Sequence, residues 1–480
     1  MRALRRPAAF SRVSQLAEQR GVHLAFQWLH LHGPKIMQWQ AEVVAIAAPP
    51  FSESARAEWL ADRFRELGLT KVGIDAAGNA LGTYAASSVD RGTGERCVLV
   101  SAHIDTVFPL ATPIRSKVEG DRLTAPGACD NGAGIVALLA IAAALRHGGI
   151  AVPCDLLFAG NVGEEGEGDL RGMRQLYSQA LKQQRDLSSP VDLAPAGGQR
   201  MKSPIILAHL VIDGAGHELA VTSAVGSRRY LATIEGSGGH SWSDAGRPNP
   251  IVAMSRAIAS LAKQPVREDT RWNVGTIEGG TSVNSIPEVA SARFDLRSTD
   301  AEELIRLEVE LHRALEDAVF AVNSGDASSS PVPGEVQQQR PDLSGRGNAG
   351  GASNRLAIDL LTSAHRARST NGVTLGQSRS GQLRLSVEKI GDRPAGRLAP
   401  GARILETLLA VDRHLGIHTG ERSASTDANI PLSLGREALS IGAGGEGGGV
   451  HTSSEWYDAR NRELGLRRIL LLLLALAESA

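Results

Sequence analysis

The stretch "CVLVSAHID", Cys97 to Asp105, decides the fold, because it opens as a continuous apolar run and ends in residues that can bind a metal. A continuous run, in place of strict alternation, is typical of a strand buried on both faces. Two later stretches repeat this design: "CDLLFAGNVGEE" (154–165) and "IILAHLVIDGAG" (205–216). The three runs therefore predict buried strands whose ends carry His or acidic side chains.

Helical patterns separate and follow these runs. "LADRFRELGL" (60–69) is amphipathic at helical spacing, and "GIVALLAIAAALRHGG" (134–149) is an apolar helix closed by glycines. "PGARILETLLAVDRHLG" (400–416) continues the pattern, and "ILLLLLALA" (469–477) is too short to span a bilayer, so it predicts a buried C-terminal helix. Alternating strands and helices predict an α/β fold with a mainly parallel, mixed sheet and flanking helices.

The order of elements changes after about residue 223. Strand and helix patterns then follow in the order βαββαβ, which predicts an inserted α+β domain over residues 224–399. The first domain would be discontinuous, with parts at 1–223 and 400–480. The segment at about 323–382 is rich in Ser, Gly, Pro and Gln, so we expect a flexible insert there.

Bulk composition excludes several classes of protein. Lys and Arg number 51 and Asp and Glu number 52, so the chain of 480 residues has no charge excess that would attract nucleic acid or an anionic membrane. Its three cysteines form no CxxC pair, and the basic N-terminus lacks the apolar region of a signal peptide. We therefore expect a cytoplasmic protein without a disulfide framework.

Side chains that can bind metals gather at the predicted strand ends. They are His103, Asp105, Glu164, Glu165 and Asp213, together with Asp130 in a glycine-flanked loop and His451 behind a glycine-rich run. Ligands of open parallel sheets collect beyond the carboxyl ends of the strands. An HxD pattern or a Glu-Glu pair alone is often incidental. Taken together, the residues predict a two-metal hydrolase site, because unpaired charge at buried strand ends is costly.

The order HxD, Asp in a glycine loop, Glu-Glu, Asp and a C-terminal His resembles the co-catalytic dizinc metallopeptidases of family 20. Relatives in that family include peptidase T, carboxypeptidase G, carnosinase, aminoacylase and succinyl-diaminopimelate desuccinylase. "GSGGHSWSDAGRPNP" (236–250) and "GTIEGGTSVNSIPEVASARFDLRS" (275–298) are similar to the lid domain of these enzymes. The resemblance covers the chain from about residue 40 to its end, except the insert.

The resemblance implies a role for each residue of this site. His103 and Asp213 would bind one zinc ion, Glu165 and His451 the other, and Asp130 would bridge the two. Asp105 would orient His103. Glu164 would be the general base, so the two adjacent glutamates would serve different functions. Cobalt or manganese could replace zinc, because sites of this type accept several divalent ions.

The lid residues implied by the resemblance complete the site. His240 would donate to the oxyanion of the tetrahedral intermediate, in family dimers from the neighbouring subunit. Asn284 and Arg297 would bind the carboxylate of the substrate, since the Arg fork binds carboxylates through two hydrogen bonds. We therefore expect a homodimer formed through the lid domain.

The sequence thus predicts a dizinc exopeptidase that hydrolyses di- and tripeptides. The alternatives are a metal-dependent amidohydrolase acting on N-acyl or N-carbamoyl amino acids and, less favoured, a non-catalytic binding relative. Asp213 resembles the aminopeptidase and dipeptidase members, whereas several other relatives carry Glu at that position. Asn131, after Asp130, departs from the acid or lysine of many relatives, and we expect little effect on metal binding.

Overall fold

The computed structural model describes residues 5–87, 96–178, 205–325 and 381–479. Its helices are α1 (Arg5–Ala17), α2 (Arg20–Leu31), α3 (Gly33–Val44), α4 (Ser54–Glu66), α5 (Gly132–His147), α6 (Arg171–Leu176), α8 (Pro250–Leu261), α9 (Ala301–Asn323), α11 (Arg403–Leu415), α12 (Asn429–Ser433) and α13 (Arg462–Glu478). Its strands are β1 (Thr70–Ile74), β2 (Ala80–Tyr84), β3 (Arg96–His103), β4 (Lys117–Glu119), β5 (Arg122–Thr124), β6 (Asp155–Asn161), β7 (Ile205–Ile212), β8 (Leu219–Ala224), β9 (Gly226–Glu235), β10 (Gly239–His240), β11 (Thr270–Gly279), β12 (Ser285–Ile286), β13 (Val289–Ser298), β14 (Arg384–Arg393), β15 (Gly396–Arg397), β16 (Gly420–Ala424), β17 (Ala438–Ile441), β18 (Glu446–Gly448) and β19 (Trp456–Asp458).

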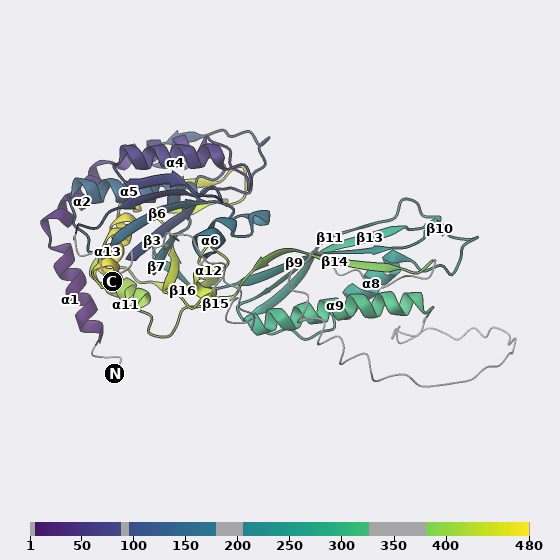
Figure 1. Cartoon of the computed structure of the whole chain (residues 1–480). Coiled ribbons are helices and arrows are strands. Elements are labelled where there is room, and N and C mark those ends of the chain that lie inside the picture. Colours follow the sequence, from purple (N-terminus) through teal and green to yellow (C-terminus); the bar gives the residue numbers. More distant parts are fainter. Residues whose placement is uncertain (1–4, 88–95, 179–204, 326–380, 480) are drawn as a thin grey trace, which may run out of the picture. The chain divides into compact units, whose positions relative to one another are not determined.

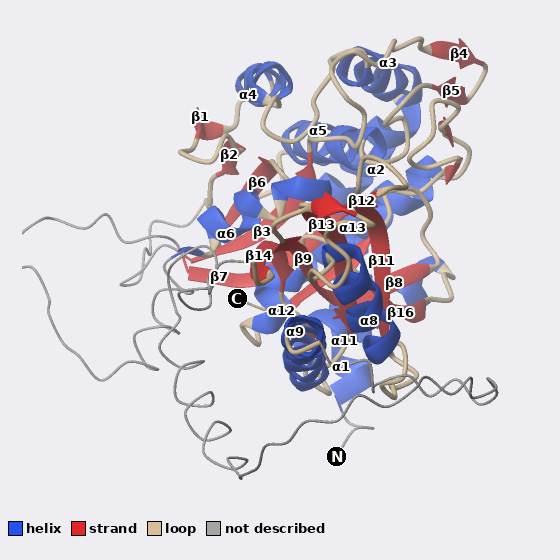
Figure 2. Ribbon diagram, turned by 90° about the vertical axis from the view of Figure 1, so that its right-hand side faces the viewer, coloured by secondary structure: helices blue, strands red, loops and turns tan. Residues whose placement is uncertain are grey.

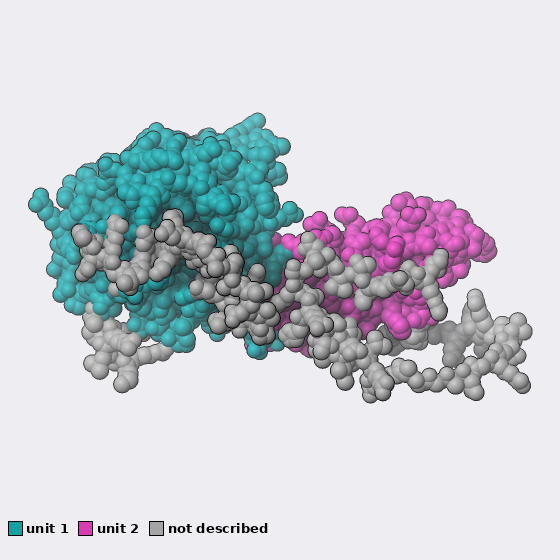
Figure 3. Space-filling view, in the orientation of Figure 1, with its two compact units in different colours: residues 1–227, 297–304, 391–480 teal, residues 228–296, 305–390 magenta. Residues whose placement is uncertain are grey.

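The chain forms two compact units, shown in different colours in Figure 3. The first contains residues 1–227, 297–304 and 391–480, and the second contains residues 228–296 and 305–390. The boundaries predicted for functional domains stay predictions. Most of the predicted insert at about 323–382 lies outside the described residues, which stop at 325 and resume at 381.

The first unit is built on a mixed sheet in the order β1-β2-β6-β3-β7-β17-β8-β15, with β16 paired to β8. The four central strands β6, β3, β7 and β17 run parallel, whereas β2 and β8 are antiparallel to their neighbours at either end of this group. The prediction of a mainly parallel, mixed sheet is confirmed. The apolar runs form its centre because both faces of these strands are covered.

Helices cover both faces of this sheet (Figures 1 and 2). In β3, Val98 and Val100 belong to the large core that contains α5 and α13, whereas Leu99 belongs to a smaller core with residues of α6 and α12. Successive side chains of a strand point to opposite faces, so both faces of β3 are buried. The predicted C-terminal helix is confirmed: the Leu run of α13 lies within the large core.

The second unit contains a separate four-stranded sheet in the order β11-β13-β9-β14, with α8 and α9 along one face (Figure 1). The predicted βαββαβ order is confirmed by these elements. A partly buried ion cluster joins them: the Glu308 carboxylate of α9 accepts hydrogen bonds from Arg228 and Tyr230 of β9. Lys389 of β14 lies 2.9 Å from the same carboxylate.

Among the described residues, none of the helices combines the length and the apolar character needed to cross a membrane.

Candidate metal centre

Three parallel strands bring the predicted ligands to one edge of the large sheet. β3 ends at His103, which pairs in register with Asn161, the last residue of β6. Glu164 and Glu165 follow β6 after a short turn, and Asp213 directly follows β7. The ends of these strands lie side by side because the strands are parallel neighbours, so residues far apart in the sequence meet at one point.

Asp130 is positioned by a loop that the Glu455 side chain holds in place. The buried Glu455 carboxylate accepts hydrogen bonds from the main-chain N–H groups of Gly127 (3.1 Å), Cys129 (2.8 Å) and Asp130 (2.7 Å). The peptide bond from Asp130 to Asn131 is cis. These contacts fix the direction in which the Asp130 carboxylate leaves the loop.

Asn131, the residue that follows Asp130, has a structural function. Its side-chain oxygen accepts hydrogen bonds from the main-chain N–H groups of Gly134 and Gly214, and its amide donates to the carbonyl of Ile212. Asn131 therefore caps the N-terminus of α5 and links that helix to the end of β7.

His451 completes the cluster from the loop between β18 and β19. Its backbone has a φ of 65°, a left-handed conformation that is uncommon outside glycine. Its Nε2 atom lies 3.0 Å from Glu165 Oε1 and 3.3 Å from Asp130 Oδ2. The side chain is half exposed, so this part of the centre faces solvent.

The ligand side chains form three overlapping groups, two of which share Asp130. His103, Asp130 and Asp213 form one of these two, and Asp130, Glu165 and His451 form the other; the third group is His103, Glu164 and Glu165. His103 Nε2 lies 2.9 Å from Asp130 Oδ1 and 3.8 Å from Asp213 Oδ1, so the two Asp130 oxygens face different histidines. Zinc ligands at 2.0–2.2 Å in a tetrahedron are about 3.4 Å apart. The observed spacing and the N/O donor set therefore fit divalent metal ions, and Asp130 belongs to both of the groups that contain a histidine and an aspartate.

The electrostatics of this cluster also fit bound cations. Burial alone would lower the pKa of His103, but the carboxylates of Asp105, Asp130 and Asp213 raise it well above its usual value. Hydrogen bonding to Asp130, together with the charge of Glu165, raises the pKa of His451 to about 9. The carboxylates thus favour positive charge at both histidines, which is the charge that metal ions would supply.

Asp105 contacts the glutamate turn as well as His103. Its buried carboxylate accepts the main-chain N–H groups of Glu164 (3.0 Å) and Glu165 (2.7 Å). His103 Nδ1 lies 3.2 Å from the Asp105 main-chain carbonyl and 3.7 Å from its carboxylate. The carbonyl is thus the nearer partner of the His103 ring, and the carboxylate fixes the backbone from which both glutamates project.

Glu164 is buried and forms an ion pair with Arg393, the last residue of β14. Arg393 Nη1 lies 3.0 Å from Glu164 Oε1, and Nη2 donates to the Glu164 main-chain carbonyl. Nη1 also lies 3.2 Å from Ser425 Oγ. Burial raises the pKa of Glu164 well above its usual value, although the charge of Arg393 opposes this shift. Glu164 is therefore a carboxylate that can both accept and release a proton.

A second buried acid lies behind this pair. Asp427 accepts a hydrogen bond of 2.7 Å from the Asn161 side chain, and burial raises the pKa of Asp427 to about 7. Sequence patterns gave no signal for Asp427, Arg393 or Glu455, because each is a single polar residue outside any ligand spacing. Only their three-dimensional contacts connect them with the site.

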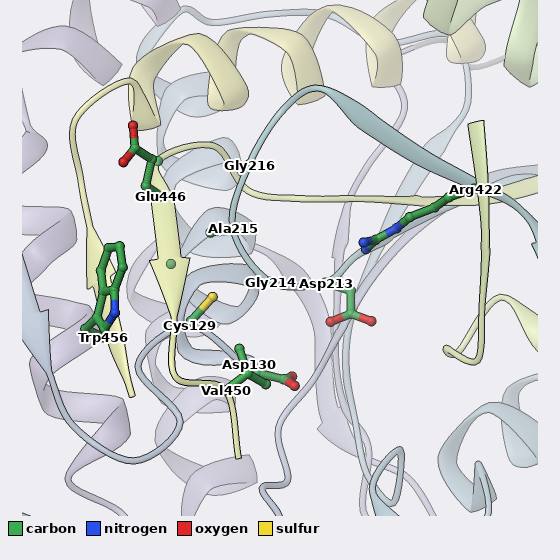
Figure 4. A pocket seen from close by; sticks show the side chains of 12 residues that line it. Cys129, Asp130, Asp213, Gly214, Ala215, Gly216, Arg422, Glu446, Val450 and Trp456 are labelled. Carbon is green, nitrogen blue, oxygen red and sulfur yellow. The ribbon is translucent and has the colours of Figure 1, made fainter. Parts of the chain in front are cut away.

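A pocket of about 530 Å³ opens beside the ligand cluster (Figure 4). Asp130 and Asp213 line one part of it, and their carboxylates point into it. Other parts are lined by Arg422 of β16, Glu446 of β18 and Trp456 of β19. The pocket can therefore accommodate a small molecule in contact with the ligand residues.

The predicted lid residues lie in two places. His240 in β10 and Asn284 are neighbours, because the Ser241 main-chain N–H donates to the Asn284 carbonyl at 2.9 Å. Both are exposed. Arg297 lies near the end of β13, which follows Asn284 and is about 30 Å long for its ten residues. The structure thus brings His240 and Asn284 together in the second compact unit, whereas Arg297 belongs to the first.

Comparison with known proteins defines the family. A model of peptidase family M20/M25/M40 matches residues 99–475, which include every predicted metal ligand. The chain belongs to this family. The family comprises metal-dependent hydrolases of peptide and amide bonds, which confirms the predicted enzyme class and resemblance.

The relatives of this family member span different substrates. A succinyl-diaminopimelate desuccinylase of Beijerinckia indica is 25% identical over 295 residues, which are 54% of this chain and 72% of the relative. Alignments with other curated relatives cover as little as 44% of their length. Among solved structures, aminopeptidase PepT from Bacillus cereus has a TM-score of 0.63 at 16% identity, covering 93% of this chain and 99% of its own.

An amidase of the hydantoinase/carbamoylase family from Burkholderia vietnamiensis shares the fold with a TM-score of 0.58. It is 16% identical, and the match covers 93% of this chain and 97% of that one. At these identities the structural matches establish the fold of the two units and leave the substrate open.

Proposed function

We propose that this family member is a dizinc exopeptidase that hydrolyses di- and tripeptides. The observation that carries the proposal is the arrangement around Asp130, whose two oxygens each face a different histidine, with the buried carboxylate of Glu164 one residue from Glu165. His103 and Asp213 would hold one ion, and Glu165 and His451 the other. Cobalt or manganese could take the place of zinc.

The reaction requires a base, and Glu164 fits this role. Two divalent ions would supply Lewis-acid activation of a water molecule and of the scissile carbonyl. Glu164 would take the proton of the attacking water and return it to the leaving amine. Its raised pKa suits both steps, and Asp105 and Arg393 hold the carboxylate and its backbone in one orientation.

His240 is a candidate donor to the oxyanion. Its Nδ1 atom accepts hydrogen bonds from the main-chain N–H groups of Trp242 (3.1 Å) and Ser243 (3.3 Å). An Nδ1 atom that accepts must be unprotonated, so in the neutral ring the proton is on Nε2. The lid turn thus supports a histidine with its remaining N–H available for a substrate oxygen.

Recognition of the substrate carboxylate by Asn284 and Arg297 remains part of the proposal. Asn284 is exposed between β11 and β12, and Arg297 lies near the end of β13. The proposal also includes a homodimer through the lid domain.

The second candidate is a metal-dependent amidohydrolase that acts on N-acyl or N-carbamoyl amino acids. The observation that favours it is the fold shared with the Burkholderia amidase, in addition to that shared with PepT. It would use the same metal ligands and base, so only the substrate pocket would differ. A non-catalytic relative is disfavoured because every ligand and the base are present.

A mass-spectrometric hydrolysis panel tests the proposal. Zinc-loaded protein is incubated with free di- and tripeptides, N-blocked peptides, C-terminal amides, and N-acetyl and N-carbamoyl amino acids. The Glu164→Gln variant serves as a control for contaminating hydrolases, since it keeps all metal ligands. Cleavage of peptides but not of the acyl or carbamoyl compounds supports the exopeptidase. The N-blocked peptides and the C-terminal amides then show which free terminus the enzyme requires. Cleavage of only the acyl or carbamoyl compounds refutes it in favour of the amidohydrolase.

A further inference from the structure

Arg422 is the only cationic side chain among the described residues that line the pocket beside the ligand cluster. It projects from β16 toward Asp213 in Figure 4. The other charged groups in the lining are the carboxylates of Asp130, Asp213 and Glu446. Bound metal ions would neutralise the first two, which leaves Arg422 as the positive side chain in the described lining of the pocket.

The Arg422 guanidinium has no hydrogen bond or ion pair with any side chain in the described part of the molecule. The adjacent Glu421 does not satisfy it, because its carboxylate accepts a hydrogen bond of 2.9 Å from Thr222 Oγ1. Neighbouring residues of a strand project to opposite faces, so Glu421 and Arg422 point apart. An arginine with five free donors in a pocket is suited to a planar anion.

The rest of the lining leaves room for a side chain of the ligand. Gly214 and Gly216 have φ values of 71° and 90°, so their positions exclude larger residues without strain. At Gly447 a Cβ atom would lie 2.3 Å from Cys129 Sγ. Trp456 forms the opposite wall, and its ring stacks against the Arg122 guanidinium at 3.9 Å.

We propose that Arg422 forms a specificity subsite for a carboxylate on the substrate, either an acidic side chain or a second carboxylate next to the scissile bond. This inference rests on the proposed function, because it places the reacting amide at the ligand cluster. The substrate class would then be peptides, or acylated amino acids, that contain aspartate or glutamate.

Matched pairs of acid and amide substrates test this subsite. The pairs are Ala-Asp with Ala-Asn, Asp-Ala with Asn-Ala, the corresponding Glu and Gln peptides, and N-acetyl-Asp with N-acetyl-Asn. In the wild-type enzyme we expect kcat/KM to favour the acid about tenfold at one position, since the pair is partly exposed to water. Arg422→Met should abolish that ratio through KM, and Arg422→Lys should restore part of it.

The control variant is Arg65→Met, which removes an exposed arginine of α4 paired with Asp62 and should leave the ratio unchanged. Equal losses of activity on acids and amides in Arg422→Met, or an unchanged ratio, would refute the subsite. A second readout needs no turnover: N-acetyl-Asp should raise the melting temperature of the zinc-loaded protein more than N-acetyl-Asn does. That difference should vanish in Arg422→Met.

These readouts separate the two proposals. If no substrate is cleaved but the difference in melting temperature depends on Arg422, the proposed function fails and the subsite stands. If peptides are cleaved without any preference that depends on Arg422, the subsite fails and the proposed function stands.

Discussion

Replacing Arg393 by methionine should reduce turnover far more than it reduces substrate binding. Arg393 is 6% exposed, and its guanidinium donates to both the carboxylate and the carbonyl of Glu164. Methionine preserves much of the apolar stem but leaves the buried Glu164 carboxylate without its cationic partner. Breaking a buried ion pair by removing one member costs about 3–5 kcal/mol.

Part of this free-energy cost should lower the stability of the fold, and part should raise the activation free energy of the reaction. A carboxylate without this partner can turn toward other donors or take up a proton, and either change removes the base. If about 3 kcal/mol of the loss falls on the transition state, kcat drops by about 100-fold, since each 1.36 kcal/mol is a factor of ten. KM should change little, because Arg393 contacts the base and not the pocket beside Asp213.

The assay compares Arg393→Met with Arg468→Met. Arg468 is fully buried and its Nε lies 2.6 Å from Asp412 Oδ1, so its removal breaks a comparable ion pair among residues outside the ligand cluster. Both variants should lose stability in urea unfolding, but only Arg393→Met should lose kcat. In a Glu164→Gln background, Arg393→Met should have little further effect on turnover. Equal loss of kcat in both arginine variants would refute the reasoning.

Three further predictions concern Glu164, Arg297 and Glu308. Glu164→Gln should keep both metal ions by elemental analysis and lose most turnover, and a parallel fall in metal content would remove Glu164 from the base role. Arg297→Ala should weaken substrates with a free C-terminal carboxylate more than their amides, and equal losses would exclude it from substrate recognition. Burial alone would raise the pKa of Glu308, but its hydrogen bonds and the positive charge of Arg228 lower it overall. Its ionised form therefore stabilises the fold above pH 4.5, and this contribution disappears as pH falls through the lowered pKa. Glu308→Gln should thus cost about 1–3 kcal/mol at pH 7 and less at pH 3.5 in urea unfolding; a constant difference would contradict the assignment.

The local sequence was sufficient to predict the elements that carry the site. Apolar runs within strands of seven or eight residues define β3, β6 and β7, because a strand covered on both faces needs apolar side chains at consecutive positions. The His, Asp and Glu residues at the ends of these strands can also be recognised from the local sequence. The order of the strands in the sheet was harder to predict from the sequence. The pairing of β3 with both β6 and β7 depends on the packing of α5 and α13 against the sheet.

What the sequence alone determined about this family member is therefore the class of fold and the side chains that are candidates for metal binding. The tertiary structure decided how these side chains are held. Arg393 meets Glu164 across 229 positions, and Glu455 meets Asp130 across 325. No spacing rule connects such pairs, because a single buried ion pair or carboxylate cap has no periodicity. It forms where burial makes an unpaired charge costly, and only the packed fold defines that burial.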